Sequence, residues 1–306
     1  MEFDIIVIGG GIAGLSAALT AARLGRSVGV ISGGVPGGEL LNIELIDGLP
    51  GHEEGIAGFD LCPIAMDQAT AAGAEIITET AETISSSDEG YVVLADGNEY
   101  AARALILAMG AHVAKLGVPG EEEFTGRGVS HCATCDGPLL RGKTVVVAGG
   151  GDSGMQEALT LAQHVEKVLL VERGEALSGQ ASYVEAVEAE PAIEVMTGME
   201  VTAISGADKL EQVILKEVSS GAESTLEVQG LFAFVGLEPN LDPAADLVEL
   251  ADDGRIAVDG ALRTSAKGVF AVGNLRSGNS WRAAGAMGDG ATAAVEAARY
   301  LDSGAW

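Results

Sequence analysis

The sequence predicts an α/β protein made of two domains, each built on a parallel sheet, because one local pattern occurs twice along the chain. The pattern is a run of apolar residues, then a glycine-rich turn, then a helix-forming stretch, and its copies begin at residues 4–8 and 144–148. A continuous apolar run is typical of a strand that a parallel sheet buries on both faces. The chain length of 306 residues also suits two domains of ordinary size.

The first turn carries the spacing Gly9-x-Gly11-x-x-Gly14 directly after residues 4–8. The first glycine permits the tight turn, the second lets the backbone approach a pyrophosphate, and the third allows close contact between helix and strand. An alanine-rich helix then points its N-terminus at the phosphates, and residues 28–31 form the next strand. A glycine fingerprint between a strand and a helix predicts a Rossmann-like dinucleotide-binding domain.

The second turn repeats this spacing as Gly149-x-Gly151-x-x-Gly154, with Ser153 inside it. A helix is expected from Met155 onward, and the next strand covers residues 168–171. In an oxidoreductase, two such folds suggest a bound flavin dinucleotide, FAD, and a nicotinamide donor.

The ends of the two following strands differ. Glu172 stands where an acid can accept hydrogen bonds from a ribose 2′-hydroxyl, whereas the matching position in the first copy is Ser32. A carboxylate there would also repel a 2′-phosphate, so Glu172 favours NADH over NADPH. The alternative interpretation of Glu172 is a solvated charge at the end of a strand.

Between the two modules, shorter elements are expected. They are a glycine-rich loop over a ligand at 33–40, a helix at 56–72 that contains Cys62, and strands between 74 and 107 around a hairpin turn at Asp96-Gly97. Residues 112–120 lead into the second domain.

After the second module the sequence predicts short strands over 193–235, a return crossing that begins within 234–240, a strand over 268–274 and a helix over 285–301. No low-complexity linker separates the domains, so the first domain must be discontinuous. We expect residues 1–112 and 244–306 to form the FAD-binding domain and residues 113–243 to form the inserted pyridine-nucleotide domain.

Composition excludes several classes of partner. The formal net charge of −28, from 45 acidic and 17 basic residues, disfavours nucleic acid and anionic membrane. No apolar run is long enough to span a bilayer, and the acidic N-terminus is not a signal peptide. Three cysteines are too few for a disulfide scaffold, so a reducing cytoplasm is the expected location. The acidity fits a salt-adapted organism or simply an acidic protein, and both interpretations stay open.

Cys132 and Cys135 are separated by two residues, and Asp136 follows directly. This spacing lets the two sulfurs meet across one turn of backbone and close a small, reducible disulfide ring. The adjacent acid could protonate the thiolate that leaves when the ring opens. The alternative, half of a zinc site, needs two more soft ligands, and the remaining cysteine, Cys62, has no histidine at metal spacing. We therefore expect a redox pair and no metal site.

Taken together, these motifs resemble the low-molecular-weight thioredoxin reductase family, flavoproteins of the pyridine nucleotide-disulfide oxidoreductase class, almost from end to end. The most specific matches are 126–130 leading into 132–137, the second fingerprint, 236–240 and 268–274. The resemblance implies a homodimer whose flavin is reduced by a nicotinamide and then reduces the cysteine pair, with a rotation of the domains between these events. It also implies that Cys132 attacks the disulfide of a thioredoxin-like protein, Cys135 faces the flavin and Asp136 handles the proton.

The resemblance assigns the cofactor sites residue by residue. The FAD residues are Gly9, Gly11, Gly14, Ser32, Gly38, Glu39, Leu40, Gly110, Gly273, Asn274, Arg282 and Ala283. The NAD residues are Gly149, Gly151, Ser153, Gly154, Glu172 and Arg173.

Several positions depart from the family pattern. NADPH-using members carry a His-Arg-Arg-x-x-x-Arg cluster for the 2′-phosphate, and Arg173 alone survives here beside Glu172, which makes NADPH doubtful. On the flavin side, Glu39 replaces a glutamine, Asn274 an aspartate, and Ala283 a glutamine. Asn274 can still hydrogen-bond a ribityl hydroxyl, so FAD binding remains expected, although such contacts help to set the flavin potential.

Four functions are compatible with these residues. The first is an NADH-dependent reductase of a thioredoxin-like protein or a small disulfide. The second is a ferredoxin-dependent reductase, which the intact second fingerprint and the acidic surface disfavour. The third is a flavin-dependent dithiol oxidase that uses oxygen, which the retained Asp136 disfavours. The fourth is a redox-sensing binding protein without turnover, which the retained cysteine pair disfavours.

Overall fold

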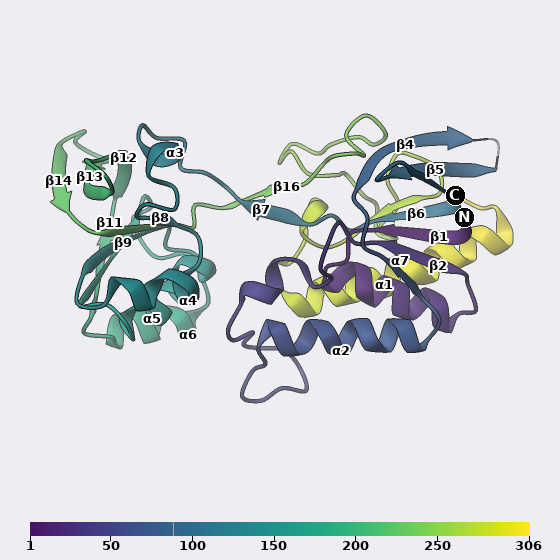
Figure 1. Cartoon of the computed structure of the whole chain (residues 1–306), viewed down its shortest axis with the longest axis horizontal. Coiled ribbons are helices and arrows are strands. Elements are labelled where there is room, and N and C mark those ends of the chain that lie inside the picture. Colours follow the sequence, from purple (N-terminus) through teal and green to yellow (C-terminus); the bar gives the residue numbers. More distant parts are fainter. Residues whose placement is uncertain (88) are drawn as a thin grey trace. The chain divides into compact units, whose positions relative to one another are not determined.

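The computed structural model describes residues 1–87 and 89–306 and divides into two compact units (Figure 1). Unit 1 comprises Met1–His112 and Pro239–Trp306, and unit 2 comprises Val113–Glu238. The chain leaves unit 1 in β7 (Ala111–Val113) and returns in β16 (Leu237–Pro239), and these two strands pair with each other.

The return boundary lies earlier than the expected one between residues 243 and 244. The reason is that Leu241 and Ala244, which follow β16, already pack in the apolar core of unit 1 beside Val248 and Leu275. The segment 239–243 therefore belongs to unit 1.

Unit 1 is built on a mainly parallel sheet in the order β3-β2-β1-β6-β5-β4, with β17 paired to β6. Its parallel strands are β1 (Glu2–Ile8), β2 (Val28–Ile31), β3 (Glu75–Ile77), β6 (Asn98–Leu107) and β17 (Val269–Ala271). The antiparallel strands are β4 (Ala81–Ser87) and β5 (Gly90–Ala95). Asp88, within the stretch expected to form strands, lies outside the described residues. The hairpin turn at Asp96 and Gly97 is confirmed, with φ values of 42° and 80°.

The helices of unit 1 are α1 (Ile12–Arg23), α2 (Gly58–Ala71) and α7 (Ala283–Ser303), with the 3-10 turns η1 (Gly38–Asn42) and η3 (Gly273–Leu275). Small residues let α1 and α7 approach closely, since a Cβ added at Gly290 would lie 2.1 Å from the carbonyl oxygen of Ala13. At the end of the chain, Trp306 packs edge-on against Phe270 and Tyr300.

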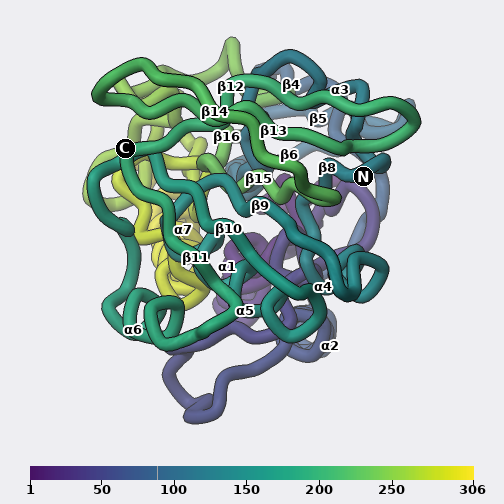
Figure 2. Tube along the Cα trace, turned by 90° about the vertical axis from the view of Figure 1, so that its left-hand side faces the viewer, coloured from purple at the N-terminus to yellow at the C-terminus, as the bar shows by residue number. Residues whose placement is uncertain are grey.

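Unit 2 contains a parallel sheet with the strand order β11-β10-β9-β15-β8, and Figure 2 shows these strands side by side. The strands are β8 (Val129–Ser130), β9 (Thr144–Ala148), β10 (Lys167–Glu172), β11 (Ile193–Thr197) and β15 (Gly230–Ala233). A second, antiparallel sheet contains β12 (Met199–Gly206), β13 (Leu210–Glu217) and β14 (Glu223–Glu227). The helices are α3 (Glu121–Phe124), α4 (Ala133–Asp136), α5 (Asp152–Ala162) and α6 (Ala181–Ala189), and the 3-10 turn η2 (Gly137–Leu140) follows α4.

Two expected elements differ from the structure. The strand expected over 268–274 ends at Ala271, because Gly273, at a φ of 68°, turns the chain into η3, so Asn274 lies beyond the strand. The helix expected from Met155 begins earlier, at Asp152, because the glycine turn itself starts the helix.

Within the described residues, no helix is long and apolar enough to cross a membrane.

Candidate functional site

The first position of each glycine turn can be occupied only by glycine. Gly9 and Gly149 have φ values of 108° and 112°. A Cβ on Gly9 would lie 2.3 Å from the oxygen of Ala108, and one on Gly149 would lie 2.2 Å from the oxygen of Phe234. Both turns therefore press against the neighbouring strand in the same way.

The third glycine of each turn allows the helix to begin directly against it. A Cβ at Gly14 would lie 2.0 Å from the oxygen of Gly9, and one at Gly154 would lie 1.8 Å from the oxygen of Gly149. A side chain at either position would push the helix away from the turn.

The second glycine of each turn faces open space instead. A Cβ added at Gly11 or at Gly151 would meet no atom within 4 Å, and the first residues of α1 and α5 follow directly. A diphosphate requires open space beside backbone that has no side chain, next to the N-terminus of a helix. Both turns therefore fit a dinucleotide, the first in unit 1 and the second in unit 2.

Several of the expected FAD residues lie close to the first glycine turn or to the helix that follows it. The Cβ of Ser32 would lie 2.7 Å from a Cβ added at Gly10, and its hydroxyl oxygen is 2.7 Å from the carbonyl oxygen of Gly34. Gly38 lies directly over Gly11, with 3.3 Å between an added Cβ and the Gly11 Cα. Leu40 and Ala283 pack in the same apolar cluster as Ile12 of α1.

The remaining expected FAD residues also belong to unit 1. Gly110 accepts a hydrogen bond from the backbone of Asn240 at 3.0 Å, just after β6. Glu39 and Arg282 are exposed, and Arg282 donates to the carbonyl of Trp281 at 3.2 Å. Glu39 lies in η1 beside Gly38, and Arg282 directly precedes α7.

The segment with Gly273 and Asn274 is held by side chains that the sequence did not single out. Asp289 of α7 accepts the N–H of Gly273 at 3.0 Å and forms a two-point ion pair with Arg276, with distances of 2.7 and 2.8 Å. Arg255 donates to the carbonyl of Asn274 and lies 4.2 Å from the ring centre of Trp281. Burial of its guanidinium lowers the pKa of Arg255. These contacts fix the turn beside α1.

In unit 2, the carboxylate of Glu172 is tied to the second glycine turn. Its two oxygens accept the N–H groups of Gly150 and Gly174, both at 2.6 Å. Glu172 is therefore an ordered part of the turn and not a freely solvated strand-end charge. Ser153 is exposed in the first turn of α5.

Arg173, the remaining basic residue of the phosphate cluster, is already paired. Its Nε lies 3.3 Å from an oxygen of Glu200, whose other oxygen accepts from Lys216 at 3.1 Å. The side chain of Arg173 is 77% exposed and that of Glu200 is 25% exposed, so the pair lies at the protein surface. The pairing draws the guanidinium toward β12.

The cysteine pair forms a disulfide between Cys132 and Cys135, as the spacing predicts. Cys132 precedes α4 and is half-buried, while Cys135 is exposed on the helix. The N–H of Cys135 points at the sulfur of Cys132, 3.2 Å away. That backbone dipole would stabilise a thiolate on Cys132 once the disulfide is reduced.

Neighbouring groups anchor the pair. The N–H of Cys132 donates to the hydroxyl of Ser130 at 3.1 Å, and the N–H of Asp136 donates to the carbonyl of Cys132 at 3.1 Å. The N–H of Ala133 donates to a carboxylate oxygen of Glu157, on α5, at 3.0 Å. In the described part of the chain the carboxylate of Asp136 has no hydrogen-bond partner.

Cys62 is separate from this chemistry. It is a free thiol, fully buried in α2, and burial raises its pKa. A buried, protonated thiol is a poor nucleophile. Across residues 1–87 and 89–306 no group of His, Cys, Asp and Glu side chains could hold a metal ion.

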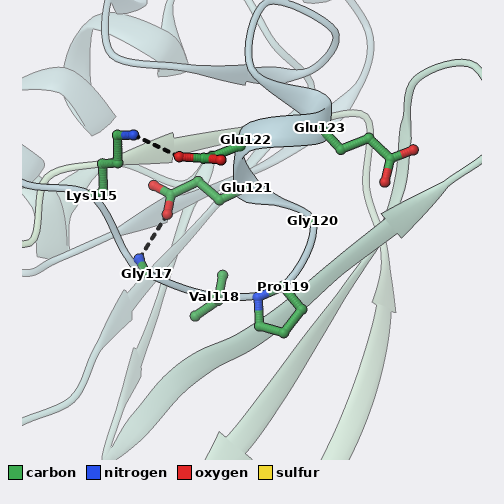
Figure 3. Close-up of a pocket in the computed structure, with 8 residues that line it drawn as sticks. All are labelled: Lys115, Gly117, Val118, Pro119, Gly120, Glu121, Glu122 and Glu123. Atoms are coloured by element: carbon green, nitrogen blue, oxygen red, sulfur yellow. Dashed lines mark hydrogen bonds and ion pairs between the residues drawn. The ribbon is translucent and has the colours of Figure 1, made fainter.

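A pocket of about 460 Å³ follows β7 in unit 2 and contains no cysteine (Figure 3). Glu121, only 3% exposed, accepts the backbone N–H groups of Leu116 and Gly117 at 2.8 and 2.7 Å. Lys115 pairs with Glu122 at 2.9 Å, and Glu123 points away from both in Figure 3. These carboxylates shape the segment that enters unit 2.

Comparison with known proteins places this geometry in context. Residues 3–290 match the family model described as pyridine nucleotide-disulphide oxidoreductase. A thioredoxin reductase of Treponema pallidum is 38% identical over 99% of this chain and 98% of its own length. A bifunctional thioredoxin reductase/thioredoxin of Mycobacterium leprae is 40% identical over 97% of this chain and 66% of its own length. The crystal structure of a Lactococcus lactis thioredoxin reductase has a TM-score of 0.95 at 33% identity and covers 98% of this chain and 99% of that one.

Proposed function

Because the chain belongs to the pyridine nucleotide-disulphide oxidoreductase family and is an FAD-dependent disulfide oxidoreductase, we propose that it is a thioredoxin reductase that works through Cys132 and Cys135. The observation that carries the proposal is the Cys132–Cys135 disulfide, which exposes Cys135 and lies next to α5, the helix that begins at the second open glycine turn. The relative at 38% identity is named thioredoxin reductase, and the one at 40% identity is named bifunctional thioredoxin reductase/thioredoxin.

We assign FAD to the turn of unit 1 and a nicotinamide dinucleotide to the turn of unit 2. The open place over Gly11, bordered by Gly38 and the fixed Gly273–Asn274 segment, supports the first assignment. The open place over Gly151 supports the second. When bound, the flavin supplies the two-electron chemistry that turns the disulfide into a dithiol, with the nicotinamide as hydride source.

Disulfide exchange then follows from the residues of α4. The Cys132 thiolate, stabilised by the N–H of Cys135, attacks one sulfur of the partner disulfide and forms a mixed disulfide. Asp136 takes the proton of the Cys132 thiol and passes it to the partner thiolate that leaves. The Cys135 thiol then gives its proton to Asp136 and attacks Cys132, so the Cys132–Cys135 disulfide forms again. The second partner thiolate takes this proton from Asp136 and is released as a thiol. One disulfide is reduced and one is formed, so electrons balance.

We infer that NADH is preferred to NADPH. Glu172 presents a carboxylate at the edge of the turn, where it can accept from ribose hydroxyls and repel a 2′-phosphate. Arg173, which a phosphate would need, is paired with Glu200. A thioredoxin is the partner that the name of the fused Mycobacterium leprae relative supports. A homodimer in the cytoplasm is part of the same proposal.

The proposal is tested by anaerobic titration of the purified flavoprotein, with flavin absorbance and thioredoxin disulfide reduction as separate readouts. We expect NADH to bleach the flavin rapidly, NADPH to bleach it slowly, and NADH to sustain thioredoxin reduction. A C132S variant should keep flavin bleaching and lose thioredoxin reduction, which serves as the matched control. If neither nucleotide bleaches the flavin, the nicotinamide assignment fails, and reduced ferredoxin is the next donor to test. Bleaching without thioredoxin reduction would overturn the assigned partner.

A further inference from the structure

We propose that Glu157 of α5 is a positioning residue for the cysteine pair: its carboxylate anchors the first peptide of α4, and its charge restrains ionisation of the Cys132 thiol. The inference rests on the redox role proposed above for Cys132 and Cys135.

The anchor is a hydrogen bond between a side chain of α5 and the backbone of α4. The N–H of Ala133 donates to Oε2 of Glu157 at 3.0 Å. Ala133 is fully buried and shares an apolar cluster with Met155, Ala158 and Leu161 of α5. The carboxylate therefore projects from a packed helix surface, and α4 begins at a fixed position on it.

The charge of Glu157 acts on the adjacent cysteine. The Ala133 N–H belongs to the peptide bond that joins Ala133 to Cys132, so the carboxylate is bonded to the Cys132 peptide itself. A negative charge hydrogen-bonded to the peptide that follows Cys132 disfavours a thiolate on Cys132, whereas the N–H of Cys135 favours it. Glu157 therefore opposes the backbone dipole and keeps the reduced pair from ionising too readily.

Other titratable groups lie on the elements around α4. His131 and Asp136 belong to the same segment, and Asp152 lies at the start of α5. His164 follows α5, and its ring would lie 3.2 Å from a Cβ on Gly137. Each of these groups is unchanged when Glu157 alone is replaced, so a matched set of variants isolates the Glu157 charge.

Glu157→Gln keeps an oxygen that can accept from Ala133 and removes the charge, whereas Glu157→Ala removes both. The control is Glu166→Gln, which removes one charge from an exposed residue of the same unit. The full-chain holoenzyme is reduced with a phosphine, without nucleotide or thioredoxin. Alkylation of Cys132 by limiting iodoacetamide is then followed by peptide mass spectrometry from pH 5 to pH 10.

We expect the alkylation midpoint of E157Q to move down by about one pH unit, so that Cys132 reacts severalfold faster near neutral pH. E166Q should match the wild type. If E157Q shows the wild-type profile, or a midpoint shifted upward, the inference is wrong even where thioredoxin turnover is intact. A merely structural role would leave the E157Q profile unchanged and alter only E157A. If the wild-type enzyme does not reduce thioredoxin, the proposed function is refuted instead. The two failures can be told apart, because the alkylation assay needs neither thioredoxin nor nucleotide.

Discussion

At the residue scale, two positions of the second glycine turn require glycine for different physical causes. Gly154 is required by packing, since an added Cβ would lie 1.8 Å from a backbone oxygen. Gly151 faces open space, so its lack of a side chain leaves room for a ligand over the turn. The same contrast holds for Gly14 and Gly11 in unit 1. Structure and ligand binding can therefore be separated by single substitutions.

We expect G154A to destabilise the protein by about 1–3 kcal/mol or more, because helix α5 must move away from the turn. G151A should unfold at nearly the wild-type temperature but raise the KM for NADH about tenfold or more, since the added methyl group would enter the site that we propose for the diphosphate. Thermal unfolding and steady-state kinetics check the two outcomes. Equal effects of both variants on stability would contradict the distinction.

Glu172 is the second residue whose geometry predicts a measurable preference. Glutamine in its place can accept one backbone N–H but not two, and it carries no charge to repel a phosphate. E172Q should weaken NADH binding by about ten- to a hundredfold and narrow the preference over NADPH. The nearby exposed Glu175 offers the control variant E175Q. An unchanged ratio of kcat/KM for the two nucleotides would show that Glu172 does not select between them.

At the element scale, the sequence predicted the strands, turns and disulfide that a short stretch of neighbouring residues determines. The apolar runs at 28–31 and 144–148 coincide with β2 and β9, because a strand buried on both faces needs unbroken apolar residues. The cysteine spacing likewise predicted the disulfide. Side chains that reach across the fold were missed. Glu157 meets Ala133 from another helix, and Asp289 meets Gly273 from α7, and no local pattern marks either contact.

The start of β1 carries an ion pair that makes stability depend on pH. Burial alone would raise the pKa of Asp4, but hydrogen bonds from Ser27 and the ion pair with Arg103 outweigh it, so the pKa is lowered from 3.8. A lowered folded-state pKa stabilises the fold above the ordinary value, and this contribution is lost as the pH falls through the folded-state pKa.

D4N should therefore lower the free energy of unfolding at pH 7 by up to about 1 kcal/mol, because Arg103 is half exposed and the pair is screened by water. The difference from wild type should shrink toward pH 3, where the carboxylate is protonated in the unfolded chain. Urea unfolding at the two pH values measures this, with E2Q as the control on the same strand. A difference that stays constant with pH would exclude the ion pair as its cause.

At the scale of the whole molecule, the net charge of −28 is the dominant property that no single element explains. Basic side chains are scarce, and several of them are bound to acids: Lys115 pairs with Glu122, and Arg173 and Lys216 share Glu200. Most carboxylates are therefore uncompensated, and their mutual repulsion opposes the compact state. The two interpretations of this acidity, salt adaptation and plain acidity, differ in how stability should respond to salt.

Screening of repulsion alone is nearly complete once the Debye length falls from about 10 Å at 0.1 M salt to about 3 Å at 1 M. A plainly acidic protein should therefore gain unfolding temperature as KCl rises to about 1 M and then level off. A salt-adapted protein should keep gaining stability well beyond that concentration, because its acidic surface requires concentrated salt to stay properly hydrated. We expect the steep early rise in either case, measured by thermal unfolding across a KCl series with flavin fluorescence as a second readout. An unfolding temperature that does not respond to KCl below 1 M would show that the repulsion is already compensated within the fold.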